Sequence, residues 1–287
     1  LFFKDNVERS LEVKNIGKDD ESKFFYFLNL RTSIKEIKIQ NSQILFPSFG
    51  ARYFPKYNLD NSTIEKITIN ESEIVFRDNF EDYNRIKSII GLDLSYNNII
   101  SIPIHFKRFY NIEYLYLKRN KLKSLDLNYD LRLKDLDLSE NEFTKIPDFV
   151  FALKFLLKLN LNSNELTELS ITKENRCLEY LYLVNNKFSK IPIEINYFRS
   201  LKHLALDSNK IVEINVNIFK EDLSLKITLS SNDIIGACPG LEKNILTLPI
   251  PKDISEKATG NKKNESIDLK VEGGSNVPLI IEKKEFE

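Results

Sequence analysis

The amino-acid sequence predicts an α/β solenoid, a fold in which stacked repeats each add one strand to a parallel β-sheet. Two observations predict it. Seven asparagines recur at spacings of 21 to 23 residues, and each closes the same phrase of apolar and variable positions. A fixed period of this length indicates stacked repeats. The asparagines are Asn97, Asn120, Asn141, Asn164, Asn186, Asn209 and Asn232.

Each phrase contains two apolar residues separated by one variable residue, as in Leu136 and Leu138. This is the periodicity of a strand, in which alternate side chains point to opposite faces. One apolar face of this size becomes a core only when the next repeat stacks on it. The asparagine follows where the chain turns away, and its amide can both donate to and accept from the backbone groups of the turn. We therefore expect a buried asparagine ladder.

The phrase resembles the leucine-rich repeat consensus over roughly residues 86–236. The resemblance implies a horseshoe with its parallel sheet on the concave face. Ile102-Pro103, Ile146-Pro147 and Ile191-Pro192 are similar to the Leu-Pro repeats of bacterial and some intracellular members. Proline fixes φ and removes a donor, so we expect a short helical turn after each Ile-Pro step. Repeats without proline are expected to have extended segments on the convex side.

Four regions follow from this pattern. Residues 1–30 are expected to be an N-terminal cap with a helix over 19–30, and residues 31–85 degenerate repeats with Ser42 and Ser72 in place of asparagine. Residues 86–240 are regular repeats, and residues 241–287 are a linker followed by a cap or tail. In the last region Ile267–Val271 and Val277–Ile281 read as two strands around Gly273-Gly274, with a flexible tail as the alternative.

Composition argues against chemistry and against several classes of partner. Lysine plus arginine equals aspartate plus glutamate at 42 each, without the basic excess of a nucleic-acid-binding surface. No apolar run is long enough for a membrane span. His105 and His203 have no nucleophile at a useful spacing, and no metal-ligand or phosphate-loop motif occurs. We therefore predict no catalytic residues, no metal and no cofactor, and interpret Glu140 as a charge partner of Arg119.

The remaining candidate is a binding surface on the concave face, where the variable strand positions face solvent. Tyrosine there is typical of binding hot spots, although duplication of the stretch Glu-Tyr-Leu-Tyr-Leu explains the tyrosines equally well. The predicted partner-binding residues are Tyr114, Tyr116, Lys118, Asp137, Asn160, Tyr180, Tyr182 and His203.

The sequence thus predicts a non-enzymatic, monomeric module that binds a protein or peptide. Two alternatives remain: a structural or adhesive bacterial surface protein, and the recognition arm of a larger enzyme. The chain lacks the cysteine-rich caps usual in extracellular animal and plant members of the resembled family. Location at the surface of, or secretion from, a bacterium is favoured over the cytoplasm. Because the chain begins at Leu1 rather than Met, we expect a processed protein or part of a longer one.

Overall fold

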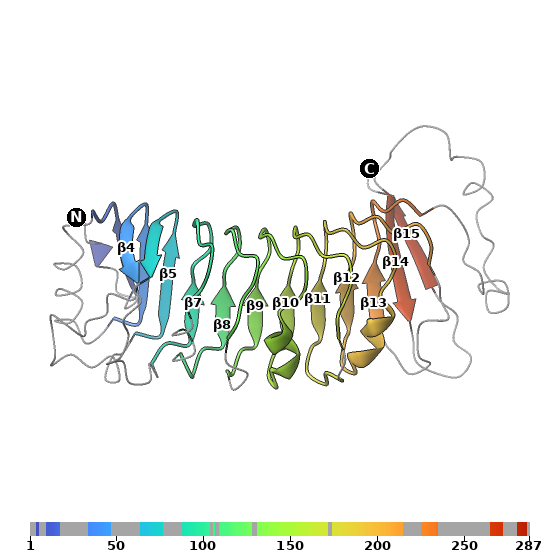
Figure 1. The fold of residues 1–287 in the computed structure, drawn as a ribbon, viewed down its shortest axis with the longest axis horizontal. Helices are drawn as coiled ribbons and strands as arrows, with labels where there is room; N and C mark the ends of the chain where they lie inside the picture. The colour runs from blue at the N-terminus through green and yellow to red at the C-terminus, as the bar shows by residue number, and fades with distance from the viewer. Residues whose placement is uncertain are drawn as a thin grey trace. The chain divides into compact units, whose positions relative to one another are not determined.

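The computed structural model describes most of the repeat region and both ends of the sheet (Figure 1). The described residues are 4–5, 10–17, 34–46, 64–76, 88–103, 106, 109–127, 131–171, 174–214, 225–234, 265–271 and 280–285. The chain forms two compact units. The first contains residues 1–142 and 147–156, and the second contains residues 143–146 and 157–287.

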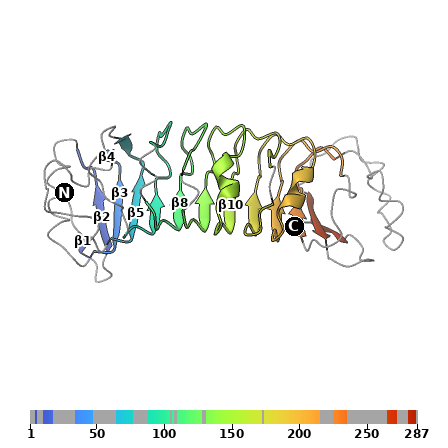
Figure 2. The ribbon, with the colours of Figure 1, turned by 60° about the horizontal axis from the view of Figure 1, so that its bottom comes forward.

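In the first unit, six strands form a parallel sheet, with a short antiparallel strand beside the first of them. In sheet order these are β1 (Lys4–Asp5), β2 (Ser10–Lys14), β3 (Glu36–Gln40), β5 (Lys66–Asn70), β7 (Gly91–Asp93), β8 (Tyr114–Tyr116) and β9 (Asp135–Asp137). Figure 2 shows β1, β2, β3 and β5 side by side. Leu92, Leu115 and Leu136 are paired in register, so the repeat phrase of the sequence is the register of the sheet.

A second, two-stranded parallel sheet lies in the first unit. It consists of β4 (Gln43–Phe46) and β6 (Glu73–Phe76), which pair residue for residue from Gln43 and Glu73 onwards. Each strand directly follows one of the two serine turns. The degenerate repeats therefore carry an extended, hydrogen-bonded segment beyond the turn, which the sequence pattern did not indicate.

In the second unit, four parallel strands are followed by an antiparallel hairpin. The strands are β10 (Lys158–Asn160), β11 (Tyr180–Tyr182), β12 (His203–Ala205), β13 (Leu225–Thr228), β14 (Glu265–Val271) and β15 (Ile280–Glu285). β14 pairs with β13, so the hairpin covers the last parallel strand. The second strand of the hairpin lies at Ile280–Glu285, whereas Val277–Ile281 was predicted.

The core is a stack of apolar side chains from alternate strand positions. Leu115, Leu136, Leu159, Leu181 and Leu204 are each at most 1% exposed. Burial of one such side chain stabilises a fold by about 1.5–3 kcal/mol, so the period in the sequence is also the period of the packing energy. The solenoid prediction, with one parallel strand per repeat, is confirmed.

The segments beyond the turns differ as predicted after two of the three Ile-Pro steps, while residues 104–105 and 107–108, after Pro103, lie outside the described residues. Two 3₁₀ helices, η3 (Asp148–Ala152) and η4 (Ile193–Tyr197), begin directly after Pro147 and Pro192. Each proline carbonyl accepts a hydrogen bond from the amide three residues on, Val150 at 3.0 Å and Ile195 at 3.3 Å. Residues 125–127 and 169–171, from repeats without the step, contain no helix.

The predicted N-terminal cap, residues 1–30, contains a strand that the sequence pattern did not indicate. Ser10–Lys14 forms β2, which pairs in parallel with β3. Its repeat has Leu11 and Val13 in the core and Ile16 where later repeats have serine or asparagine. The predicted helix over 19–30 lies outside the described residues. No helix in the described ranges has the length and apolar character needed to cross a membrane.

Candidate functional site

A left-handed residue starts every turn that leaves the sheet in the described repeats. Ten non-glycine residues have φ between 47° and 60°, and each directly precedes the position of Ile16, a serine or an asparagine. They are Asn15, Asn41, Glu71, Tyr96, Arg119, Glu140, Ser163, Asn185, Ser208 and Ser231. This conformation reverses the chain abruptly and leaves backbone groups without a strand partner.

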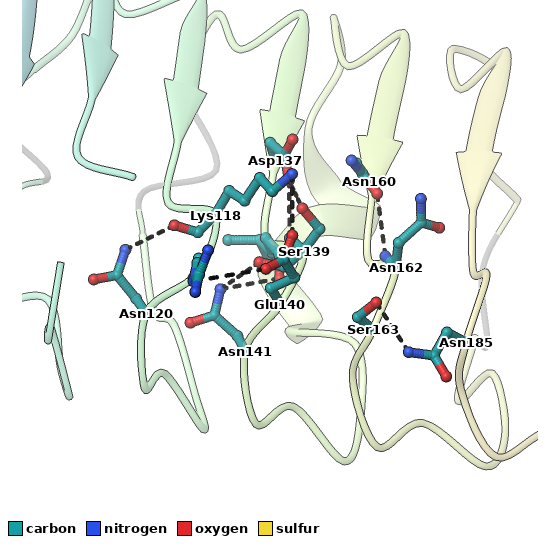
Figure 3. A network of polar contacts seen from close by, with 12 residues as sticks. Lys118, Asn120, Asp137, Ser139, Glu140, Asn141, Asn160, Asn162, Ser163 and Asn185 are labelled. Atoms are coloured by element: carbon teal, nitrogen blue, oxygen red, sulfur yellow. Dashed lines mark hydrogen bonds and ion pairs between the residues drawn. The ribbon is translucent and has the colours of Figure 1, made fainter. Parts of the chain in front are cut away.

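The asparagines satisfy these backbone groups. Asn120 is typical: its Oδ1 accepts from the amide of Ile99 in the preceding repeat at 3.0 Å. Its Nδ2 donates to the carbonyls of Leu94 at 2.9 Å and Leu117 at 3.0 Å, and more weakly to Lys118 at 3.3 Å. One amide thus ties two consecutive turns together. Figure 3 shows the bonds within each turn, from the amide of Asn120 to Lys118 and from the amide of Asn141 to Ser139. Asn141 also reaches the preceding repeat, at the Leu117 carbonyl. Six of the seven asparagines are buried, and Asn232 is half-buried.

The two serines make fewer bonds. The Oγ of Ser42 accepts from the amide of Ile16 at 2.9 Å and donates to the carbonyl of Gln40 at 2.8 Å. Ser72 repeats this arrangement with Ser42 and Asn70. A hydroxyl has one proton to donate where an amide has two, so a serine cannot hold the carbonyls of two repeats at once.

The strand face, defined as the side of each sheet whose residues alternate with the buried leucines, bears tyrosines and aspartates in the first unit. Tyr114 and Tyr116 are half-buried on β8, beside Asp135 and Asp137 of β9. The hydroxyl of Tyr116 lies 3.5 Å from the Asp135 carboxylate. Burial, followed by the negative charge of Asp135, raises the pKa of Tyr116 to about 12. The Asp137 carboxylate accepts from the Ser139 hydroxyl at 2.6 Å, which fixes its orientation.

Lys118, at the end of the strand face, is held by a charge. Its Nζ lies 3.0 Å from Oε1 of Glu140, and Nε of Arg119 lies 4.0 Å from Oε2. The predicted Arg119–Glu140 pair is therefore present, with Lys118 as the closer partner (Figure 3). The hydrogen bond to Glu140 raises the pKa of Lys118.

In the second unit the strand face combines aromatic and basic groups. Tyr180 is 37% exposed, and Tyr182 meets the His203 ring edge-on with centroids 5.6 Å apart. The Nζ of Lys158 lies 5.9 Å from the Tyr182 ring centroid, within the range of a cation–π contact. Asn160 accepts from the amide of Asn162 at 3.1 Å, so its side chain is held against its own strand.

The eight predicted partner-binding residues fall into two groups of four. Tyr114, Tyr116, Lys118 and Asp137 lie together in the first unit; Asn160, Tyr180, Tyr182 and His203 lie together in the second. In both units they occupy the partly exposed positions that alternation predicts. Their role in binding stays a prediction. His105 lies outside the described residues, and within the described ranges no group of three metal-ligating side chains could hold an ion.

Sequence reasoning missed Tyr96. This side chain is 40% exposed at a left-handed position, beside Lys118 and Arg119. The signal was available, because Tyr96 directly precedes Asn97. Strand alternation points only to strand positions, and the turn position before each asparagine lies outside that pattern.

Comparisons with known proteins agree with this geometry. A family model described as leucine rich repeat matches residues 132–188. The chain carries leucine-rich repeats. A leucine-rich repeat protein of Leptospira interrogans is similar in structure, with a TM-score of 0.51 and 22% identity over 72% of this chain and 57% of that one. At this identity the likeness shows the fold alone.

Two relatives match in sequence over part of the repeat array. The human leucine-rich repeats and immunoglobulin-like domains protein 3 is 27% identical over 139 residues, 47% of this chain. The adenylate cyclase of Schizosaccharomyces pombe is 26% identical over 172 residues, 58% of this chain. The matches cover only 12% and 8% of these relatives, which are far longer than the matched repeats.

Proposed function

We propose that this chain is a non-enzymatic protein-interaction module whose strand face binds a protein or peptide. The observation that carries the proposal is the state of the strand-face tyrosines. Tyr114, Tyr116, Tyr180 and Tyr182 are partly exposed on strands whose alternate leucines are completely buried. Rigid aromatic side chains lose little conformational entropy on binding, which is why tyrosine dominates many binding surfaces.

The local contacts support a pre-organised surface. Tyr116 is oriented by Asp135, and Tyr182 lies between His203 and Lys158. Because these rings are already positioned, a partner would not have to order them, and less of the interaction energy is lost on association. Within each unit, the polar side chains beside these rings include hydrogen-bond donors and acceptors and charges of both signs. Such a mixture suits a peptide or protein surface better than a uniformly charged polymer.

A second candidate is the recognition arm of a larger enzyme. The observation that favours it is the match to the fission yeast cyclase, in which the matched repeats account for 8% of the protein. The two candidates share the same binding surface and differ in what the array is attached to. The repeats themselves would be non-catalytic in both.

The test is affinity capture from an extract of the source cells with three forms of the protein. The double variant Tyr116→Ala and Tyr182→Ala should lose the partner that the wild type retains, with binding at least about tenfold weaker, since truncated hot-spot aromatics typically cost 2 kcal/mol or more. Tyr197→Ala is the matched control: Tyr197 is 40% exposed but belongs to η4 rather than to the strand face. Equal capture of the partner by all three forms would show that the binding site does not lie on the strand face.

A further inference from the structure

Tyr96 is held in a backbone conformation that disfavours it. Its φ is 60°, in the left-handed region, where a bulky side chain is strained. No other described turn has an aromatic residue at this position, and Asn15, Asn41 and Asn185 show that asparagine fills it well. A tyrosine kept at this cost, with 40% of its surface exposed, indicates a role other than folding.

Two cations of the next repeat lie against the Tyr96 ring. Lys118 Nζ is 5.7 Å and the Arg119 guanidinium carbon 5.6 Å from the ring centroid. Lys118 already has Glu140 as a close partner at 3.0 Å. Arg119 Nε lies farther from the same carboxylate, at 4.0 Å, and the Arg119 side chain is 67% exposed. Most of its five N–H donors therefore remain available to a ligand.

Tyr96 and Arg119 border a hollow of about 470 Å³ in the first unit. It is lined by Glu71, Tyr96, Asn97, Asn98, Arg119, Asn120 and Lys121. Asn97 and Asn120 use their amides in the turns. The charged side chains are therefore the groups that could recognise a ligand, and two cations face one carboxylate.

Lys121 differs from the equivalent lysine of a later repeat in having no acidic partner among the described residues. The lysine at the equivalent position of a later repeat, Lys187, pairs with Glu165 at 3.2 Å. The acidic residue one repeat beyond Lys121 is Glu142, and it pairs with Lys123 at 3.5 Å. In the described part of the chain the Lys121 ammonium has no ion pair, although it lines the hollow.

We propose that this hollow is a second binding site, which takes a carboxylate side chain from an acidic segment of a protein partner. The carboxylate lies between Arg119 and Lys121, because the planar guanidinium fork matches a carboxylate in shape. The adjoining apolar part of the segment packs on the Tyr96 ring. The negative charge of Glu71, which also lines the hollow, repels a doubly charged phosphate more strongly than a singly charged carboxylate. The site is independent of the proposed function, because none of the eight strand-face residues is Tyr96, Arg119 or Lys121. A test of one proposal therefore does not decide the other.

An NMR titration of the whole chain tests the site, following the Tyr96 ring and the Arg119 Nε–H signals. A capped hexaglutamate peptide should give saturable shifts at both, while capped hexalysine should give none. Arg119→Gln and Lys121→Gln should each weaken hexaglutamate binding by about threefold to fivefold, the upper part of the range for an exposed ion pair. Glu71→Gln should strengthen it. Lys123→Gln removes one positive charge two residues away, outside the hollow, and should leave the affinity unchanged.

The variant Tyr96→Asn separates binding from folding. It relieves the left-handed tyrosine, so the melting temperature should stay level or rise while hexaglutamate binding weakens. A lower melting temperature with unchanged binding would show that Tyr96 is structural and would overturn the proposal. Inorganic phosphate is the competing ligand: tighter binding of phosphate than of hexaglutamate at the same residues would overturn the carboxylate assignment. Equal weakening by Lys123→Gln would show general charge attraction instead of a site.

Discussion

The Tyr116 hydroxyl points at the Asp135 carboxylate of the neighbouring strand across 3.5 Å. The pair joins β8 to β9 on the face that bears the candidate binding residues. A neutral phenol can donate to a carboxylate, whereas a phenolate beside the same carboxylate is repelled by it. The protonation state of Tyr116 is therefore linked to the stability of the first unit.

This link predicts a loss of stability at high pH. The pKa of Tyr116 is about 12 in the folded chain against 10.0 for an ordinary tyrosine. The folded state thus binds this proton more tightly, and its contribution is complete below pH 10 and lost as pH rises from about 10 to about 12. Denaturant unfolding at a series of alkaline pH values should show a steeper decline for the wild type than for Tyr116→Phe.

Asp135→Asn separates the causes of this shift. Removal of the charge should bring the Tyr116 pKa part of the way back, because burial is the largest cause and remains. Tyrosinate absorbance during an alkaline titration measures it. An unchanged titration in Asp135→Asn would contradict the role of the carboxylate.

The asparagine ladder predicts a graded effect of substitution. Asn164 is buried and accepts from the amide of Phe143 at 3.0 Å. Asn164→Ala leaves that amide without its acceptor and should lower the free energy of unfolding by about 1–3 kcal/mol. Asn164→Ser keeps one acceptor, as at Ser72, and should fall between alanine and the wild type. Asn98→Ala, at an exposed position, is the control in the same unfolding experiment.

Local stability should differ between serine and asparagine repeats. The serine turns at Ser42 and Ser72 have fewer side-chain bonds than the turn at Asn120. We therefore expect amide hydrogen exchange to be faster in β3 and β5 than in β11 and β12, because local opening follows the weakest interactions. Equal protection factors in these four strands would show that the serine turns are not weak points.

Partner binding should depend only modestly on salt. The chain has a formal net charge of +0, and the strand-face residues include both signs. Affinity for the captured partner, measured from low to physiological ionic strength, should fall far less than the steep decline that accompanies release of many counterions from nucleic acid. A steep decline in affinity with salt would instead indicate that the partner is a polyanion and would contradict the assignment of a protein or peptide.

The regular repeats could be predicted from the sequence because burial and turn chemistry repeat with the same period. The alternation around Leu136 and Leu159 placed the strands, and Pro147 and Pro192 indicated the helical turns. The first repeat was missed because Ile16 occupies the position of the diagnostic asparagine. An apolar residue there removes the motif but not the apolar core, since Leu11, Val13 and Ile16 are all buried.

The candidate site was predictable only as a set of positions. Strand alternation determines that Tyr182 and His203 lie on the exposed face of neighbouring strands. It does not determine their rotamers, so the edge-on contact between the rings could not be anticipated. Tyr96 was missed for a different reason: its exposure follows from a left-handed backbone, which a strand pattern does not describe.

The direction of the ladder bonds gives the array a polarity. Each asparagine accepts from an amide of the repeat before it, as Asn120 does from Ile99 and Asn209 from Phe188 at 3.1 Å. Removing repeats from the C-terminal end therefore deprives the new last turn of its asparagine acceptor, whereas removal from the N-terminal end leaves every remaining asparagine acceptor in place. In both cases backbone bonds between repeats are lost, such as the bond from the Lys121 amide to the Ile99 carbonyl. Shortened versions of this protein should be made from the front, and lengthened ones by inserting whole repeats between two asparagine turns.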